Sequence, residues 1–322
     1  MIVTVCKRTH YAAALTLGKA VAAHHPDQRF VIGVADDASG LPTESANVLG
    51  LPDTGLSTDQ LTALSARYSP TEFTAALKSS FIRAAFGLFP DETTVLYLAP
   101  TAFVYQPLSP VFTELIHHSI LLNPHWLTPP TDGLDPDEKH MQNVGLYSGG
   151  FIGFRRHHET MRMLDWWAER SLDHAAINFC IGSCLDQLWL MHVPTLFENV
   201  GILKNPGLQV ALWNLPQRPL TATPIGWQVG NVPVLTADFL GLTAKNEGLF
   251  QHQNRLRLNA RPDIRQLLAD YNAALIQLPA LPPAYGQQPE RMVRTGIRRK
   301  AGQWLTRLSD WIDNVPVPPV HR

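Results

Sequence analysis

The sequence predicts an α/β protein with a mixed, mostly parallel β-sheet flanked by helices. Short apolar, β-prone runs alternate with helix-forming stretches along the chain. The first three elements are an apolar run at 1–5, a helix at 12–23 and a second apolar run at 30–34, joined by short connections. A strand–helix–strand unit of this kind holds its strands parallel with a right-handed crossover. Apolar residues make up 45% of the 322 residues, so the chain can bury the core that such a sheet needs.

Composition argues against several classes of protein. The formal net charge is -1, whereas a dedicated nucleic-acid binder carries a basic excess. Three cysteines, Cys6, Cys180 and Cys184, form no paired framework and fit a reducing compartment. Cys180 and Cys184 lack a second ligand pair, which favours buried thiols over a zinc site. No signal-peptide pattern is visible and no apolar run reaches the roughly 18 residues that span a bilayer, so we expect a cytoplasmic protein.

Polar residues follow the first two predicted strands. Cys6, Arg8 and Tyr11 come after the first strand, and Asp36 follows the second. The carboxyl ends of parallel strands share one edge of a sheet, where ligands of open α/β proteins bind. Ligand contact and simple exposure in a loop both remain open for these residues.

A third helix begins at Ser69-Pro70-Thr71-Glu72. Serine is a good cap, proline suits the first turn, and the glutamate three residues on completes a capping box. This helix carries Lys78 among apolar residues. A solvent-facing lysine and a ligand-binding lysine are both compatible with this position.

The central stretch is a strand that breaks and restarts. Residues 95–98 form a short apolar run that suits a strand buried on both faces. Ala99-Pro100-Thr101 ends it, because proline removes a backbone donor. A second β-prone run covers 102–105. The break is therefore expected at the carboxyl edge of the sheet.

Two further segments follow along the chain. Residues 123–143 are rich in Pro, Gly and Asp and predict a long surface loop. This loop is either a lid with His125 and Trp126 as its contacts or a disordered insertion. Gly149 and Gly150 then permit close backbone approach before a buried strand at 151–154 and a helix at 159–170.

These motifs together resemble GT-A glycosyltransferases, in particular bacterial relatives of the family 8 type. The relatives read roughly YLDPD at the strand break, where this chain reads Tyr97-Leu98-Ala99-Pro100-Thr101. Their YNxGFIGFRR segment corresponds to residues 147–156, with Ser148 in place of Asn. Their Asp-Gln-x-Trp corresponds to residues 186–189. The resemblance covers roughly residues 1–275 and implies the GT-A fold, a Rossmann-like nucleotide-diphospho-sugar transferase fold.

The resemblance implies a function and a set of site residues. The donor would be a nucleotide-diphosphate sugar, UDP-linked in the first instance, and the acceptor a glycan or a lipid-linked sugar. Asp186 and Gln187 would be catalytic, although Asp186 also suits a plain helix cap. The implied nucleotide-sugar-binding positions are Cys6, Arg8, Tyr11, Asp36, Lys78, Ala99, Thr101, Gly149, Gly150, Trp213, Asn214, Asp238, His252 and Arg255. Stacking on a sugar and packing in the core both remain open for Trp213.

The largest departure from the resemblance concerns the metal site. GT-A enzymes commonly hold Mg²⁺ or Mn²⁺ with the Asp-x-Asp carboxylates and a later His. This chain has Ala99 and Thr101 at the carboxylate positions and Asp238 at the His position. We therefore expect no metal cofactor, with Lys245, His252 and Arg255 as the cations available to a diphosphate. A non-catalytic protein that binds a nucleotide, glycan or protein partner is the alternative.

The last part of the chain differs in composition. A helix is predicted at 263–277, and residues 278–289 form a Pro-rich linker after a domain at 1–277. Residues 290–322 combine clustered arginines with an apolar stripe at helical spacing. Such a basic amphipathic helix is either a peripheral anchor on the inner face of a membrane or a helix docked on protein.

Overall fold

The structure is a computed structural model that describes residues 1–43, 46–243, 248–250 and 253–278. Lys245, His252, almost all of the predicted linker and the predicted basic helix lie outside the described residues. Among the described residues, no helix is both long and apolar enough to cross a bilayer.

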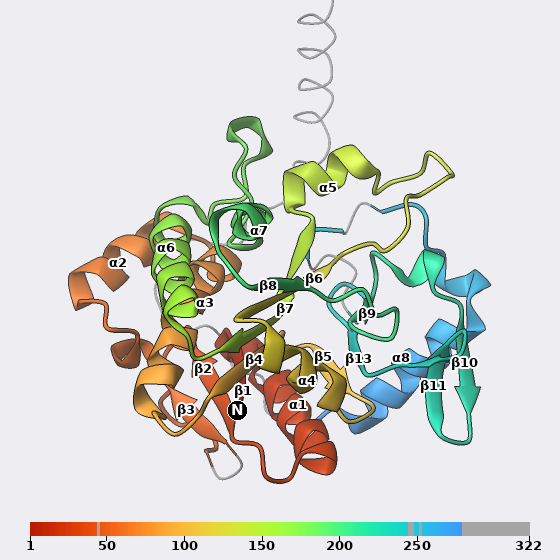
Figure 1. Ribbon diagram of the computed structural model, residues 1–322, viewed down its shortest axis with the longest axis horizontal. Helices are drawn as coiled ribbons and strands as arrows, with labels where there is room; N and C mark the ends of the chain where they lie inside the picture. Colours follow the sequence, from red (N-terminus) through yellow and green to blue (C-terminus); the bar gives the residue numbers. More distant parts are fainter. Residues whose placement is uncertain (44–45, 244–247, 251–252, 279–322) are drawn as a thin grey trace, which may run out of the picture. The chain divides into compact units, whose positions relative to one another are not determined.

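The described residues form a seven-stranded sheet in the order β3-β2-β1-β4-β7-β6-β8 (Figure 1). Within it, β7 is antiparallel to both of its neighbours, and the other pairings are parallel. The prediction of a mixed, mostly parallel sheet is therefore confirmed. The strands are β1 (Ile2–Cys6), β2 (Phe30–Val34), β3 (Asn47–Leu49), β4 (Thr94–Leu98), β6 (Ile120–Pro124), β7 (Tyr147–Arg155) and β8 (Val200–Ile202).

Helices cover both faces of this sheet, because its strands are apolar at successive positions. In β1, Val3 and Val5 face one apolar cluster, whereas Ile2 and Cys6 face another. The first cluster lies under α2 (Thr58–Arg67), α3 (Pro70–Leu88) and α6 (His158–His174). The second lies under α1 (Tyr11–His24) and α4 (Ser109–His117), as Figure 1 shows.

A smaller unit packs beside the main sheet. The strands β5 (Ala102–Val104), β13 (Thr236–Asp238) and β9 (Val210–Ala211) form one three-stranded sheet. A second contains β10 (Leu220–Thr223), β11 (Gly226–Val229) and β12 (Val232–Pro233), next to α8 (Pro262–Ala274). Phe239, which follows β13, stacks its ring on that of Tyr271 of α8, with the ring centroids 3.9 Å apart.

Several predicted boundaries change. The predicted uninterrupted loop at 123–143 is wrong, because β6 reaches Pro124 and α5 (Glu138–Val144) follows. The Asp137 side chain starts α5 by accepting a hydrogen bond from the His140 amide at 2.7 Å. The capping box at Ser69 is confirmed. The remaining short helices are α7 (Val193–Leu196), η1 (Arg8–His10), η2 (Leu51–Thr54), η3 (Phe179–Ile181), η4 (Gln187–His192), η5 (Leu215–Gln217) and η6 (Leu258–Ala260).

Gly207, which precedes β9, lies so close to the segment that leads into β13 that no side chain fits there. Its carbonyl accepts hydrogen bonds from the amides of Leu235 and Thr236. A Cβ at Gly207 would lie 1.9 Å from the Pro233 carbonyl oxygen, which is a backbone atom. Gly207→Ala is therefore expected to lower the free energy of unfolding by about 3 kcal/mol in urea titrations. Gly87→Ala is the control, because Gly87 lies in α3 with open space around it and alanine favours a helix. Equal stabilities of the two variants would contradict the close approach.

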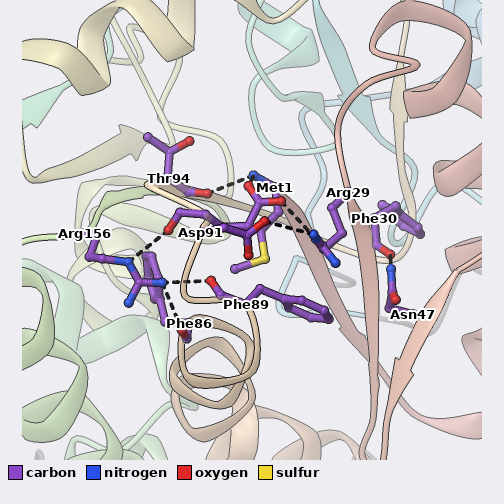
Figure 2. Close-up of polar contacts among 10 residues, drawn as sticks. Met1, Arg29, Phe30, Asn47, Phe86, Phe89, Asp91, Thr94 and Arg156 are labelled. Atoms are coloured by element: carbon purple, nitrogen blue, oxygen red, sulfur yellow. Dashed lines mark hydrogen bonds and ion pairs between the residues drawn. The ribbon is translucent and has the colours of Figure 1, made fainter.

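A charged network closes the opposite edge of the sheet from the strand break. The Met1 ammonium lies 2.8 Å from a Glu92 carboxylate oxygen, and Arg29 Nε donates to the other oxygen at 3.0 Å. Figure 2 shows Met1 and Arg29 in this network. It also shows Arg156, which donates to the backbone carbonyls of Phe86 and Phe89. Burial raises the pKa of Glu92, but the bonds from the ammonium and the guanidinium outweigh it and hold the pKa below its ordinary value.

Glu92→Gln is expected to destabilise the fold in a pH-dependent way. A carboxyl group whose pKa is lowered by folding stabilises the fold above its unfolded pKa, about 4.3 for glutamate, and loses this effect as the pH falls through the folded value. The variant should lose about 1 kcal/mol at pH 7, because the pair is partly screened, and match wild type in strong acid. Urea titrations at several pH values measure this, with Asp91→Asn as the more exposed control. A difference that persists unchanged in acid would exclude the charge as its cause.

Candidate active site

The strand break brings distant parts of the chain together at the carboxyl edge of the sheet. The Ala99 amide donates to the Gly150 carbonyl at 2.8 Å, which places the end of β4 beside the start of β7. The chain then turns at Pro100 into β5, and β5 pairs with β13 so that Ala102 faces Asp238. The structure thus brings Ala99, Thr101, Gly150 and Asp238 to one place.

A buried ion pair lies beside this place. Lys78 Nζ of α3 is 2.6 Å from an Asp186 carboxylate oxygen and donates to the Gly149 carbonyl at 2.8 Å. The two side chains are 10% and 3% exposed, so the pair is shielded from water. The ammonium also lies 5.0 Å from the centroid of the Tyr97 ring, which attracts a cation.

Asp186 lies at the N-cap position of η4, but among the described residues its side chain makes no capping hydrogen bond. The carboxylate instead pairs with Lys78, and Trp167 Nε1 donates to the Asp186 carbonyl at 2.9 Å. Burial raises the pKa of Asp186, and the Lys78 ammonium opposes this by favouring the carboxylate. The helix-cap interpretation therefore does not describe the carboxylate.

Gln187 fixes the backbone next to this pair. Its Nε2 donates to the Val144 carbonyl at 2.6 Å, and its Oε1 accepts from the Gly149 amide at 3.2 Å. A Cβ at Gly149 would lie 2.8 Å from Gln187 Cβ and 3.2 Å from Lys78 Nζ. Glycine is therefore required where β7 passes the ion pair.

A second buried group is centred on Asp238. Thr101 Oγ1 donates to an Asp238 carboxylate oxygen at 2.7 Å, and the Leu240 amide donates to the same oxygen at 3.1 Å. Burial raises the pKa of Asp238, whereas these hydrogen bonds lower it; the net direction is upward. Gln209 Nε2 donates to Ser148 Oγ at 2.8 Å, and a Cβ at Gly150 would meet both this nitrogen and Asp238 Oδ2.

Gln209 was not identified from the sequence. Its Oε1 accepts from Asn123 Nδ2 at 2.9 Å, so it links β6 to β7. Its backbone has φ +46°, an uncommon conformation for a non-glycine residue. No spacing or composition signal around residue 209 points to this role, because its partners are far away in the sequence.

These residues do not fit a hard divalent cation. Such a cation needs several oxygen ligands, including carboxylates. Ala99 offers no ligand, the Thr101 hydroxyl donates to Asp238, and Asp238 is the carboxylate present there. In the described part of the chain, no three His, Cys, Asp or Glu side chains lie close enough to hold a metal ion.

Residues that follow β1 donate hydrogen bonds to the loop that follows β2. Tyr11 Oη donates to the Pro42 carbonyl at 2.5 Å, and Arg8 Nη1 donates to the Asp37 carbonyl at 2.8 Å. Cys6 is buried, which raises the pKa of its thiol. The buried Asp36 carboxylate accepts from the next amide at 2.8 Å. These groups order the loop after β2.

Trp213, Asn214 and Arg255 each contact other residues of the protein. Trp213 is buried against Phe250 with ring centroids 5.0 Å apart, which agrees with packing in the core. Asn214 Nδ2 donates to the Gln209 carbonyl at 3.0 Å. Arg255 donates from two nitrogens to the Asp132 carboxylate, so its charge is already paired.

The lid interpretation of residues 123–143 gains no support from its two proposed contacts. His125 is buried and its Nδ1 lies 2.8 Å from the Gly145 carbonyl oxygen. Trp126 Nε1 donates to the Trp213 carbonyl at 2.8 Å. Both aromatic side chains therefore contact the protein.

The polar side chains of the candidate site pair with one another, Lys78 with Asp186 and Thr101 with Asp238. A cavity of about 470 Å³ lies next to Gly18 and Asn47, and another of about 320 Å³ lies next to Glu114 and Gly201. Neither is lined by Ala99, Asp186 or Asp238.

Comparison with known proteins gives distant similarities. No protein-family model matches the chain. The uncharacterized protein YfnF of Bacillus subtilis (strain 168) is 24% identical over 217 residues, which are 67% of each chain.

Two solved structures align with most of the chain at low sequence identity. The galactosyltransferase LgtC, in complex with donor and acceptor sugar analogs, aligns with a TM-score of 0.49 at 16% identity, over 86% of this chain and 97% of that one. The glycosyltransferase GlyE of Streptococcus pneumoniae TIGR4 aligns with a TM-score of 0.47 at 12% identity, over 87% of this chain and 65% of that one. The structural neighbours of the chain thus include glycosyltransferases.

Proposed function

We propose that this protein transfers a sugar from a nucleotide-diphosphate donor, UDP-linked in the first instance, to a glycan or lipid-linked acceptor without a divalent metal. The proposal includes a cytoplasmic location, at the inner face of a membrane where the acceptor is lipid-linked. Asp186 and Gln187 would face the donor sugar, and Lys78 would face its diphosphate.

The Lys78–Asp186 ion pair is the observation that carries the proposal. When a glycosidic bond to a diphosphate breaks, positive charge develops at the anomeric carbon and negative charge on the leaving oxygen. A carboxylate and an ammonium 2.6 Å apart in a dry site could each stabilise one of these charges. The Gly149 carbonyl would hold the ammonium, and Gln187 would hold the backbone of Gly149.

The chemistry of the same region supports the proposed metal independence. Lys78 supplies a fixed positive charge, which removes the need for a cation on the diphosphate. Asp238 is bonded to Thr101 and buried, so it supplies no open cation site. Arg255 would contribute only if it left Asp132.

A non-catalytic binding protein is the second candidate. The mutual pairing of Lys78 with Asp186 and of Thr101 with Asp238 favours it, because charged groups that satisfy one another need no substrate. A protein of this kind would bind a nucleotide, a glycan or a protein partner without turnover.

Release of nucleoside diphosphate from a panel of nucleotide sugars, with and without EDTA, tests the proposal. Activity of the full chain should be unchanged by EDTA and should fall by about two to three orders of magnitude in Asp186→Asn. Asp173→Asn, at an exposed position of α6, is the matched control. Loss of activity with EDTA would refute the metal-free mechanism, and nucleotide binding without turnover would favour the second candidate.

A further inference from the structure

Three consecutive residues between α6 and η4 are exposed to solvent, although two of them are large and apolar. These are Phe179, Cys180 and Ile181, which we call the apolar tip. Phe179 is 46% exposed and Ile181 is 72% exposed. In Figure 1 the segment between α6 and α7, drawn in green, extends beyond the body of the domain.

Hydrogen bonds hold the base of the apolar tip in place. Asn178 and Ser183 exchange backbone hydrogen bonds at 2.9 and 3.1 Å, and the Asn178 side chain accepts from the Cys180 amide at 3.2 Å. Ser183 Oγ lies within donating distance of two carbonyls, that of His174 at the end of α6 at 2.9 Å and that of Ala176 at 2.7 Å. Gly182 has φ +65°, which glycine adopts without strain. The apolar tip is therefore a projection with an ordered, hydrogen-bonded base and exposed apolar side chains.

A second anchor connects the apolar tip to the core of the domain. The Ile177 amide donates to Glu72 Oε1 at 2.6 Å, and Glu72 belongs to the capping box of α3. On the other side the Phe179 ring lies 6.5 Å from that of His140 in α5. These contacts fix the direction in which the apolar tip projects.

We propose that the apolar tip enters the interfacial region of a lipid bilayer. Residues 178–183 carry no charge, so the contact they form is apolar and not ionic. The apolar tip is short and lies on a segment that projects from the domain (Figure 1), which suits insertion into a fluid apolar phase and requires no preformed pocket in a partner. Such insertion buries exposed Phe and Ile surface, which is favourable.

The position of the apolar tip connects membrane contact with the candidate active site. It lies a few residues before Asp186 in the sequence, at the same side of the domain as α5. If the proposed function holds, membrane contact here would bring Asp186 toward the head group of a lipid-linked acceptor. The membrane contact itself does not depend on catalysis.

Cys180 allows a direct test in the full chain. It is exposed, whereas Cys6 and Cys184 are buried, so a thiol-reactive environment-sensitive dye is expected to label Cys180 selectively. With phosphatidylcholine vesicles in 1 M NaCl, the dye should brighten, shift to the blue and be quenched by lipids that carry a spin label in the acyl chain. High salt and neutral lipid suppress binding through the arginines of residues 290–322. Vesicle binding without any change in the dye would overturn the proposal.

The variant Phe179→Ser/Ile181→Ser measures the contribution of the apolar tip. Its partition coefficient for the same vesicles should fall roughly tenfold to a hundredfold, as expected for losing two large apolar side chains. Ile225→Ser, at a residue 70% exposed in the β10–β11 turn, should leave binding unchanged. Equal partitioning of all three proteins would overturn the proposal. So would a lipid-free dimer that the double variant abolishes, because the apolar tip would then contact a second copy.

Activity distinguishes this inference from the proposed function. Turnover of a nucleotide sugar in lipid-free buffer should be the same in wild type and in Phe179→Ser/Ile181→Ser. Absence of turnover in both proteins with intact vesicle binding would remove the proposed function and leave the membrane contact standing.

Discussion

Lys78→Met and Asp186→Leu are each expected to lower the free energy of unfolding by about 3 kcal/mol, whereas the double variant should lie within about 1 kcal/mol of wild type. Each single change leaves a buried charge without its partner, because the two side chains are nearly inaccessible to water. The double change replaces the pair with apolar groups of similar length. The proposed sugar transfer should be lost in all three variants.

The destabilisation by Lys78→Met should depend on pH. Burial already raises the pKa of Asp186, and removing the ammonium raises it further. A carboxyl group whose folded pKa lies above its unfolded value, about 3.9 for aspartate, is destabilising at higher pH and neutral in acid. The variant should therefore approach wild type near pH 4 and differ from it most at pH 8.

Urea titrations of the four proteins at pH 4 and pH 8 measure this cycle, with Lys19→Met as the control at an exposed position. A coupling energy near zero would mean that the ion pair contributes nothing to the fold. Activity in the double variant would remove the pair from the proposed mechanism while leaving its structural role intact.

Thr101→Asp is expected to cost about 3 kcal/mol at pH 8. Thr101 Oγ1 donates to Asp238 at 2.7 Å, so an aspartate there would place two carboxylates against each other in a buried site. Like charges at this distance raise the pKa of the shared site, and the penalty should shrink toward pH 4. Thermal melts at both pH values measure the effect.

Thr101→Asn is the matched control, because its amide keeps a donor for Asp238 without adding a charge. Millimolar Mn²⁺ should leave the melting temperature of wild type unchanged, since its residues do not fit the ion. A rise in the wild-type melting temperature with Mn²⁺, reversed by EDTA, would contradict metal independence. A rise confined to Thr101→Asp would mean that a single carboxylate restores a cation site.

The sequence by itself determined the class of fold and the place of the strand break. Continuous apolar runs at β1, β2 and β4 have to be buried on both faces, and the helical segments that connect them along the chain make parallel pairing the solution. Pro100 ends β4 by local chemistry, and the capping box at Ser69 is equally local. These features depend on neighbouring residues, which is why they could be predicted.

Only the tertiary structure decided how the charged side chains pair. Lys78 meets Asp186 across more than a hundred residues, and Arg255 meets Asp132 over a similar separation. The packing of α3, β7 and the flanking loops determines these partners, because a buried charge without a partner is energetically costly. The sequence could indicate which residues carry charge near the sheet edge, but the packed fold set which of them neutralise one another.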